Sequence, residues 1–120
     1  MNRPEKILKA ASWLILLGLV IVTIVPADER PVSGLEHDWE HFVAFGLAGL
    51  IFGLAYTWHS GALCLSAIVF TLALELSQIP LATRHARLED FVVDAVAACL
   101  GIVVIHAFRK LTKSRAAAAR

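Results

Sequence analysis

Seven side chains in this sequence have types and spacings that suit ligand binding or proton exchange. Carboxylates and histidine accept and release protons, whereas arginine keeps its charge and binds carboxylates or phosphates through paired hydrogen bonds. All seven lie near the ends of apolar stretches or in the polar segment between two such stretches. The set is His41, Glu75, Gln78, Arg84, Arg87, Asp90 and Asp94.

The elements that must position these side chains are four apolar stretches, each close to the ~20 residues with which a helix crosses a membrane. The chain is 58% hydrophobic with a mean hydropathy of +0.72, whereas soluble domains are ~45–50% apolar. Backbone groups in lipid must be paired within their own segment, which favours helices. The sequence predicts an all-α polytopic membrane protein: one domain over residues 1–120, a four-helix transmembrane bundle with spans 7–25, 42–58, 61–79 and 91–108.

Turn residues and glycines indicate how these spans pack. Residues 59–61 form a tight turn, so the second and third spans are expected to make a hairpin. Gly49 and Gly53 stand four residues apart, a spacing that lets helices approach closely and that also suits a homo-oligomer contact. The alanine-rich tail, residues 114–120, is expected to be disordered.

The lysines and arginines predict the orientation of the spans. Three lie at the start of the first span and five follow the last, while three lie in the segments on the opposite side. Because basic residues accumulate on the cytoplasmic side, both termini are expected in the cytoplasm. A cleaved signal peptide ending near Val25-Pro26-Ala27 is the alternative for the first span, and cleavage would remove one helix without moving the rest.

With this topology, the polar residues gather at the outer ends of the last three spans. Glu75 precedes Pro80 by five residues, about 7 Å along a helix, so it lies inside the membrane. An ionised carboxylate at full depth costs about 2.5–3.5 kcal/mol. We expect Glu75 to face the bundle, to find a partner or to stay protonated, with Gln78 beside it on the same helix face.

Two roles for this outer cluster are open. In a structural role, Arg84 or Arg87 pairs with the acids of the cluster and pins the helices together. In a functional role, the two arginines and His41 face an anionic headgroup while the acids hold them in place. Neither a cofactor nor a nucleic acid is expected as a partner.

No metal site is predicted either. His41 with His37 and His85 lacks a recognised zinc spacing. Cys64 and Cys99 lie within apolar runs and are expected to be buried small hydrophobic residues.

The order and spacing of the polar residues resemble the VanZ-like family, small bacterial membrane proteins named after a teicoplanin-resistance protein. The resemblance covers about residues 38–105. One element is Asp38-x-x-His41-Phe42 at the opening of a span, and another is Glu75-x-x-Gln78 at the end of the next. The third is a series of an arginine, a small polar residue, an aspartate, an asparagine and two glycines, here Arg84, Arg87, Asp90, Asp94, Ala97 and Gly101. Arg87, Asp94 and Ala97 depart from that series.

The resemblance implies a protein of the bacterial cytoplasmic (inner) membrane and cell envelope, with a link to glycopeptide antibiotics, antibiotic resistance and cell-wall precursors. The favoured hypothesis is binding of membrane lipids, specifically an anionic lipid-linked or headgroup ligand, at the outer face. An enzyme with His41 or Glu75 as acid or base is an alternative, although Ser77 lacks a Gly-x-Ser-x-Gly setting. A purely structural accessory subunit and a proton-coupled transporter using Glu75 and Asp94 are further alternatives.

Overall fold

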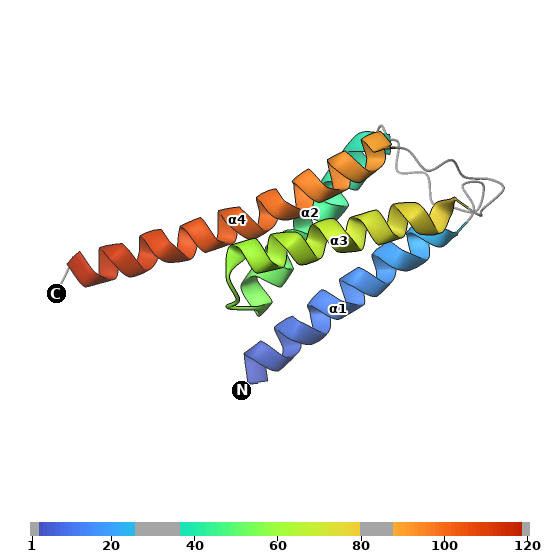
Figure 1. Cartoon of the computed structure of the whole chain (residues 1–120). Coiled ribbons are helices and arrows are strands. Elements are labelled where there is room, and N and C mark those ends of the chain that lie inside the picture. The colour runs from blue at the N-terminus through green and yellow to red at the C-terminus, as the bar shows by residue number, and fades with distance from the viewer. Residues whose placement is uncertain (1–2, 26–36, 80–87, 119–120) are drawn as a thin grey trace.

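The computed structural model describes residues 3–25, 37–79 and 88–118. Their regular elements are four α-helices: α1 (Arg3–Ile24), α2 (His37–Ala55), α3 (Ser60–Gln78) and α4 (Leu88–Ala118) (Figure 1). Three of them, α1, α3 and α4, are long and apolar enough to cross a membrane, whereas the apolar part of α2, Trp39–Ala55, is shorter. The all-helical prediction is confirmed, and the apolar helices indicate a membrane protein.

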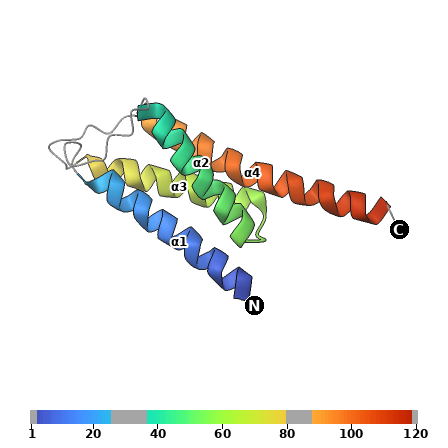
Figure 2. The same cartoon turned by 180° about the vertical axis from the view of Figure 1, so that it is seen from behind.

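The helices form a bundle around α2 and α4. α4 packs along α2 over the greatest length and also contacts α3, and α1 packs on α2 (Figures 1 and 2). α3 makes few contacts with α1 or α2. α1 and α3 end at one end of the molecule, where α2 and α4 begin; this is called the cluster end. At the opposite end, called the terminal end, α1 begins, α2 turns into α3 and α4 finishes.

The seam between α2 and α4 depends on glycine. A Cβ atom on Gly49 would overlap the carbonyl group of Ala98, and one on Gly101 would overlap the carbonyl oxygen of Gly46. Gly53 also faces α4, where an added Cβ would lie 3.3 Å from the Cα of Ile102. The predicted close helix approach is therefore confirmed. The Gly49 and Gly53 face packs against α4 of the same chain, and the homo-oligomer contact expected there stays a prediction.

α2 ends earlier than the predicted span 42–58, and a basic side chain from α4 caps its C-terminal end. The last carbonyl groups of a helix have no partner in their own helix. The guanidinium group of Arg109 donates to the carbonyl oxygens of Gly53 at 2.8 Å and Leu54 at 2.6 Å. A cation at this position also suits the helix dipole. Arg109 thus fixes the end of α2 against α4.

α4 is longer than the fourth predicted span. It continues through Lys110 and Arg115 to Ala118, so most of the tail that was expected to be disordered is helical. Alanine, lysine and arginine are among the strongest helix formers, and the apolar part of α4 provides the nucleus from which the helix extends.

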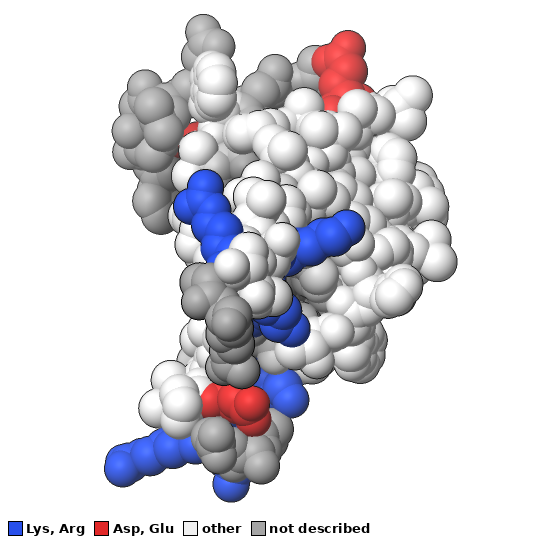
Figure 3. All heavy atoms as spheres, turned by 90° about the vertical axis from the view of Figure 1, so that its left-hand side faces the viewer, with Lys and Arg blue, Asp and Glu red and all other residues white. Residues whose placement is uncertain are grey.

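Charge separates the two ends of the bundle. Every lysine and arginine among the described residues lies at the terminal end, and Figure 3, which faces that end, shows them gathered there. They are Arg3, Lys6, Lys9, Arg109, Lys110, Lys113 and Arg115. Apart from Glu5, the acidic side chains in the described part lie at the cluster end.

Candidate functional site

His41 and Asp94 join two helices at the cluster end. The Nδ1 atom of His41 on α2 lies 2.9 Å from Oδ1 of Asp94 on α4, so a protonated Nδ1 donates to the carboxylate. The side chains are only 14% and 8% exposed. The imidazole also stacks on Phe45, one helical turn further along α2, with the ring centroids 6.0 Å apart. The contact with Asp94 and the stacking on Phe45 together hold the imidazole ring in one orientation.

Glu75 and Gln78 face the interior from α3. Their residues are 7% and 5% exposed, and Nε2 of Gln78 donates to Oε2 of Glu75 at 3.5 Å. A separation of three residues places two side chains on one helix face, and here Leu74 of the same face belongs to the hydrophobic core. The predictions that Glu75 turns into the bundle and that Gln78 lies beside it are confirmed.

Three carboxyl groups from two helices act on one histidine. Asp94, Asp90 and Glu75 all lie within electrostatic range of the His41 ring, so each of them, when ionised, stabilises a protonated imidazole. Asp90 is half-buried one turn before Asp94, at the start of α4, where a carboxylate suits the helix dipole. The fold therefore brings together the five predicted site residues that lie in its described part. Arg84 and Arg87 lie outside the described residues.

The cluster does not have the shape of a metal centre. Within residues 3–25, 37–79 and 88–118, no group of three or more His, Cys, Asp or Glu side chains is arranged to hold a metal ion. What the arrangement can do chemically is to orient an imidazole, balance charge across three helices and exchange a proton.

The two cysteines meet, which the sequence did not predict. Sγ of Cys64 on α3 lies 3.9 Å from the carbonyl oxygen of Cys99 on α4, and Sγ of Cys99 lies 3.7 Å from the carbonyl oxygen of Cys64. Both are free thiols and only half-buried, so the expectation that they are buried is corrected. Their separation of 35 residues carries no local signal, and only the packing of α3 on α4 pairs them.

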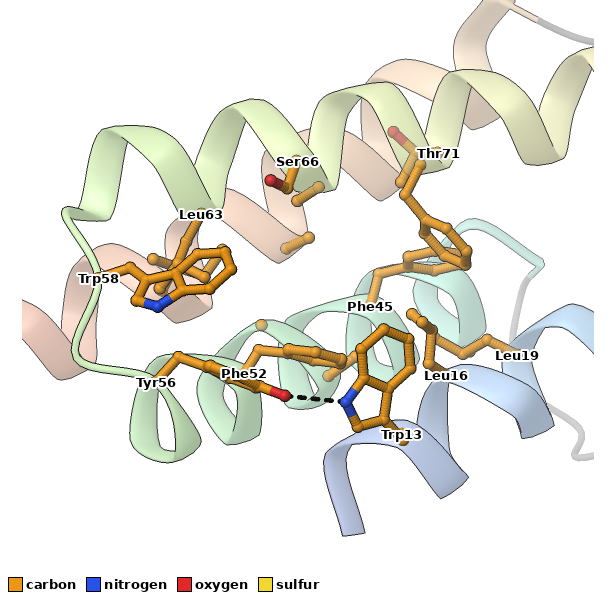
Figure 4. A pocket seen from close by; sticks show the side chains of 16 residues that line it. Trp13, Leu16, Leu19, Phe45, Phe52, Tyr56, Trp58, Leu63, Ser66 and Thr71 are labelled. Carbon is orange, nitrogen blue, oxygen red and sulfur yellow. Dashed lines mark hydrogen bonds between the residues drawn. The ribbon is translucent and has the colours of Figure 1, made fainter. Parts of the chain in front are cut away.

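An apolar cleft of about 350 Å³ is the second feature that sequence reasoning missed. Side chains from all four helices line it, and aromatic rings dominate its wall (Figure 4). At the terminal end, Nε1 of Trp13 on α1 donates to the hydroxyl of Tyr56 at 2.8 Å. The sequence signal was present, because Trp13 lies near the start of the first span and Tyr56 and Trp58 lie at the end of the second. Interfacial tryptophan is common in membrane proteins, however, and does not indicate a cleft.

No known protein family, curated protein or solved structure matches this chain. The resemblance to the VanZ-like family therefore stays a prediction that rests on the quoted residues and their spacing.

Proposed function

We propose that this chain is a four-span, VanZ-like protein of the bacterial cytoplasmic membrane that binds an anionic lipid-linked or headgroup ligand at the outer face. Both termini then lie in the cytoplasm and the cluster end faces outward. The separation of charge supports this orientation, because the basic side chains of the described residues lie at the terminal end. The link to glycopeptide tolerance and cell-wall precursors rests on the family resemblance.

The observation that carries the proposal is the buried contact of His41 with Asp94 beside Glu75 and Gln78. Ionisable side chains inside an apolar helical bundle are costly and mark functional sites by default. Here the polar side chains come from three helices and lie at one end of the bundle. A contact that only joins two helices would not require residues from a third.

The proposed ligand site completes this cluster with basic groups. Carboxylates alone repel an anion, so Arg84 and Arg87, which precede α4 in the sequence, supply the groups that bind phosphate. Asp94 orients His41, and Glu75 and the other acids balance the arginines when no ligand is bound. When the anion binds, the two arginines pair with it in place of the acids.

Lipid binding to the purified chain tests the proposal. Phosphatidylglycerol, a polyprenyl phosphate and neutral phosphatidylcholine would be compared by native mass spectrometry. We expect the two anionic lipids to bind in preference to phosphatidylcholine, and Arg84→Ala to lower that preference. Arg115→Ala is the matched control, because it removes the same charge from an exposed position at the terminal end. Equal binding of anionic and neutral lipids would refute the proposal.

The geometry of His41 favours a second candidate, an enzyme that uses this residue as acid or base. A carboxylate on one ring nitrogen fixes the tautomer and orientation of an imidazole, and the other nitrogen exchanges the proton. The 2.9 Å contact with Asp94 is of this kind. This candidate predicts that His41→Gln abolishes envelope-stress tolerance while lipid binding and folded yield stay intact. Loss of folded protein in that variant instead supports a structural accessory role.

A further inference from the structure

The apolar cleft lies where α1 and α3 diverge. Both ribbon views show these helices close together at the cluster end and apart at the terminal end. Figure 4 shows Trp13 of α1, Phe52 of α2, Tyr56 directly after α2 and Leu63 of α3 directed into the space between these helices. Trp13 and Trp58 remain 57% and 58% exposed, so this end of the cleft is open to the surroundings.

The chemistry of the wall changes along the cleft. Leu19 and Phe45 line its deeper part with hydrocarbon, while the indole N–H of Trp13 and the hydroxyl of Tyr56 lie at the open end. Tryptophan and tyrosine favour the boundary between hydrocarbon and headgroups. The cleft therefore matches the profile of one lipid molecule, with an apolar chain inside and a polar group at the mouth.

A cation stands at the open end. The ammonium group of Lys9 lies 5.3 Å from the centroid of the Tyr56 ring, which lines the mouth. Arg3 and Lys6 precede it on α1, and the acidic side chains of the described part lie at the opposite end of the bundle except for Glu5. A headgroup at this mouth meets mostly positive charge, which selects an anionic lipid over a neutral one.

We propose that the cleft binds one hydrocarbon chain of an anionic phospholipid whose phosphate lies beside Lys9. A volume of about 350 Å³ falls at the lower end of ordinary ligand pockets, which suits a single flexible chain. The mouth of the site lies at the terminal end, and none of the seven polar residues of the cluster lines it, although Phe45, on which His41 stacks, lines its deeper part. The proposal does not depend on the function proposed above.

Tryptophan quenching by brominated lipids tests the proposal, since Trp13 lies at the cleft and Trp39 at the cluster end. Two full-length variants each keep one reporter: Trp39→Phe with Trp58→Phe keeps Trp13, and Trp13→Phe with Trp58→Phe keeps Trp39. Each is placed in phosphatidylcholine vesicles that contain a small, equal fraction of brominated phosphatidylglycerol or brominated phosphatidylcholine. We expect the brominated phosphatidylglycerol to quench Trp13 more strongly.

Substitution of Lys9 then locates the headgroup. Lys9→Gln should reduce the preference of the Trp13 reporter for phosphatidylglycerol about five-fold, the contribution of one lysine at an anionic surface. Lys110→Gln is the matched control, because it removes the same charge at the exposed α4 surface of the same end. Ala67→Phe, which fills the cleft from α3, should weaken quenching of Trp13 by both lipids.

The outcomes separate this site from the cluster. Equal quenching of Trp13 by the two brominated lipids overturns the proposal, and so does a preference that survives Lys9→Gln. If Lys9→Gln does not fold, quenching of Trp13 by the two brominated lipids in the chain that keeps Lys9 still tests the proposal. Arg84→Ala should leave the Trp13 signal unchanged, so failure of the outer ligand site would appear only at Trp39 and in lipid binding at that end.

Discussion

The two ends of this bundle differ in the polarity and the exposure of their interior. At the cluster end, His41, Asp94, Glu75 and Gln78 are almost fully enclosed, and they form two bonded pairs, His41 with Asp94 and Gln78 with Glu75. At the terminal end, the cleft is apolar and open. The difference follows from the solvent, because an unpaired polar group in hydrocarbon is costly, whereas an apolar wall is satisfied by the lipid itself. Polar clusters in such a bundle must be sealed by protein, but apolar clefts need not be.

The largest effect on stability is expected from breaking the buried contact between His41 and Asp94. Asp94→Ala or His41→Ala should each lower the free energy of unfolding by about 3–5 kcal/mol, because each leaves the other partner buried without its bond. The double variant should be less destabilised than the sum of the two singles. Detergent-induced unfolding followed by circular dichroism measures these values. Glu89→Ala, an exposed neighbour on α4, is the control and should change stability by less than about 1 kcal/mol; a similar loss there would contradict the comparison.

The polar contact at the terminal end should respond less. Arg109→Gln removes the donors to the carbonyl oxygens of Gly53 and Leu54, and we expect a loss of about 1.5–3 kcal/mol, typical of a hydrogen bond to a charged group. Thermal unfolding in detergent reports the change. The adjacent exposed Lys110→Gln carries the same loss of charge and should behave like the unmodified chain. Equal stability of both variants would show that α2 needs no cap from α4.

The seam that connects the two ends gives an intermediate test. Gly49→Ala forces a methyl group onto the Ala98 carbonyl and should destabilise the bundle by about 1–3 kcal/mol. Gly18→Ala on α1 meets no atom within 4 Å and should be neutral or slightly stabilising, because alanine favours helix. The difference between the two unfolding transitions is the measurement, and its absence would mean that α2 and α4 are less tightly packed.

The smallest effect is expected at the cleft. Trp13→Phe loses the hydrogen bond to the Tyr56 hydroxyl but keeps an aromatic ring, so we expect a loss of about 0.5–1 kcal/mol. Trp39→Phe, at the cluster end, is the matched substitution and has an edge contact with Phe42 but no such bond to Tyr56. Unfolding of the two variants side by side checks the difference. A loss for Trp13→Phe as large as that for Asp94→Ala would mean that the cleft is a core element.

Much of this arrangement could be read from the sequence. Apolar length predicted the helices, and the three-residue spacing of Glu75 and Gln78 predicted a shared inward face that the structure confirms. The sequence also placed His41 and Asp94 at the same end. It did not predict their direct bond, since the sequence leaves open how the second and fourth spans are rotated about their axes.

What the sequence alone determined is the helical class, the positions of the apolar stretches and the separation of charge, because each depends on local composition and helix periodicity. The tertiary structure decided which partner each side chain meets: Asp94 for His41, Cys99 for Cys64 and Ala98 for Gly49. It also decided that α1 and α3 diverge into a cleft. The physical reason is that helix rotation and crossing are set by the fit of side chains far apart in sequence, which no local pattern encodes.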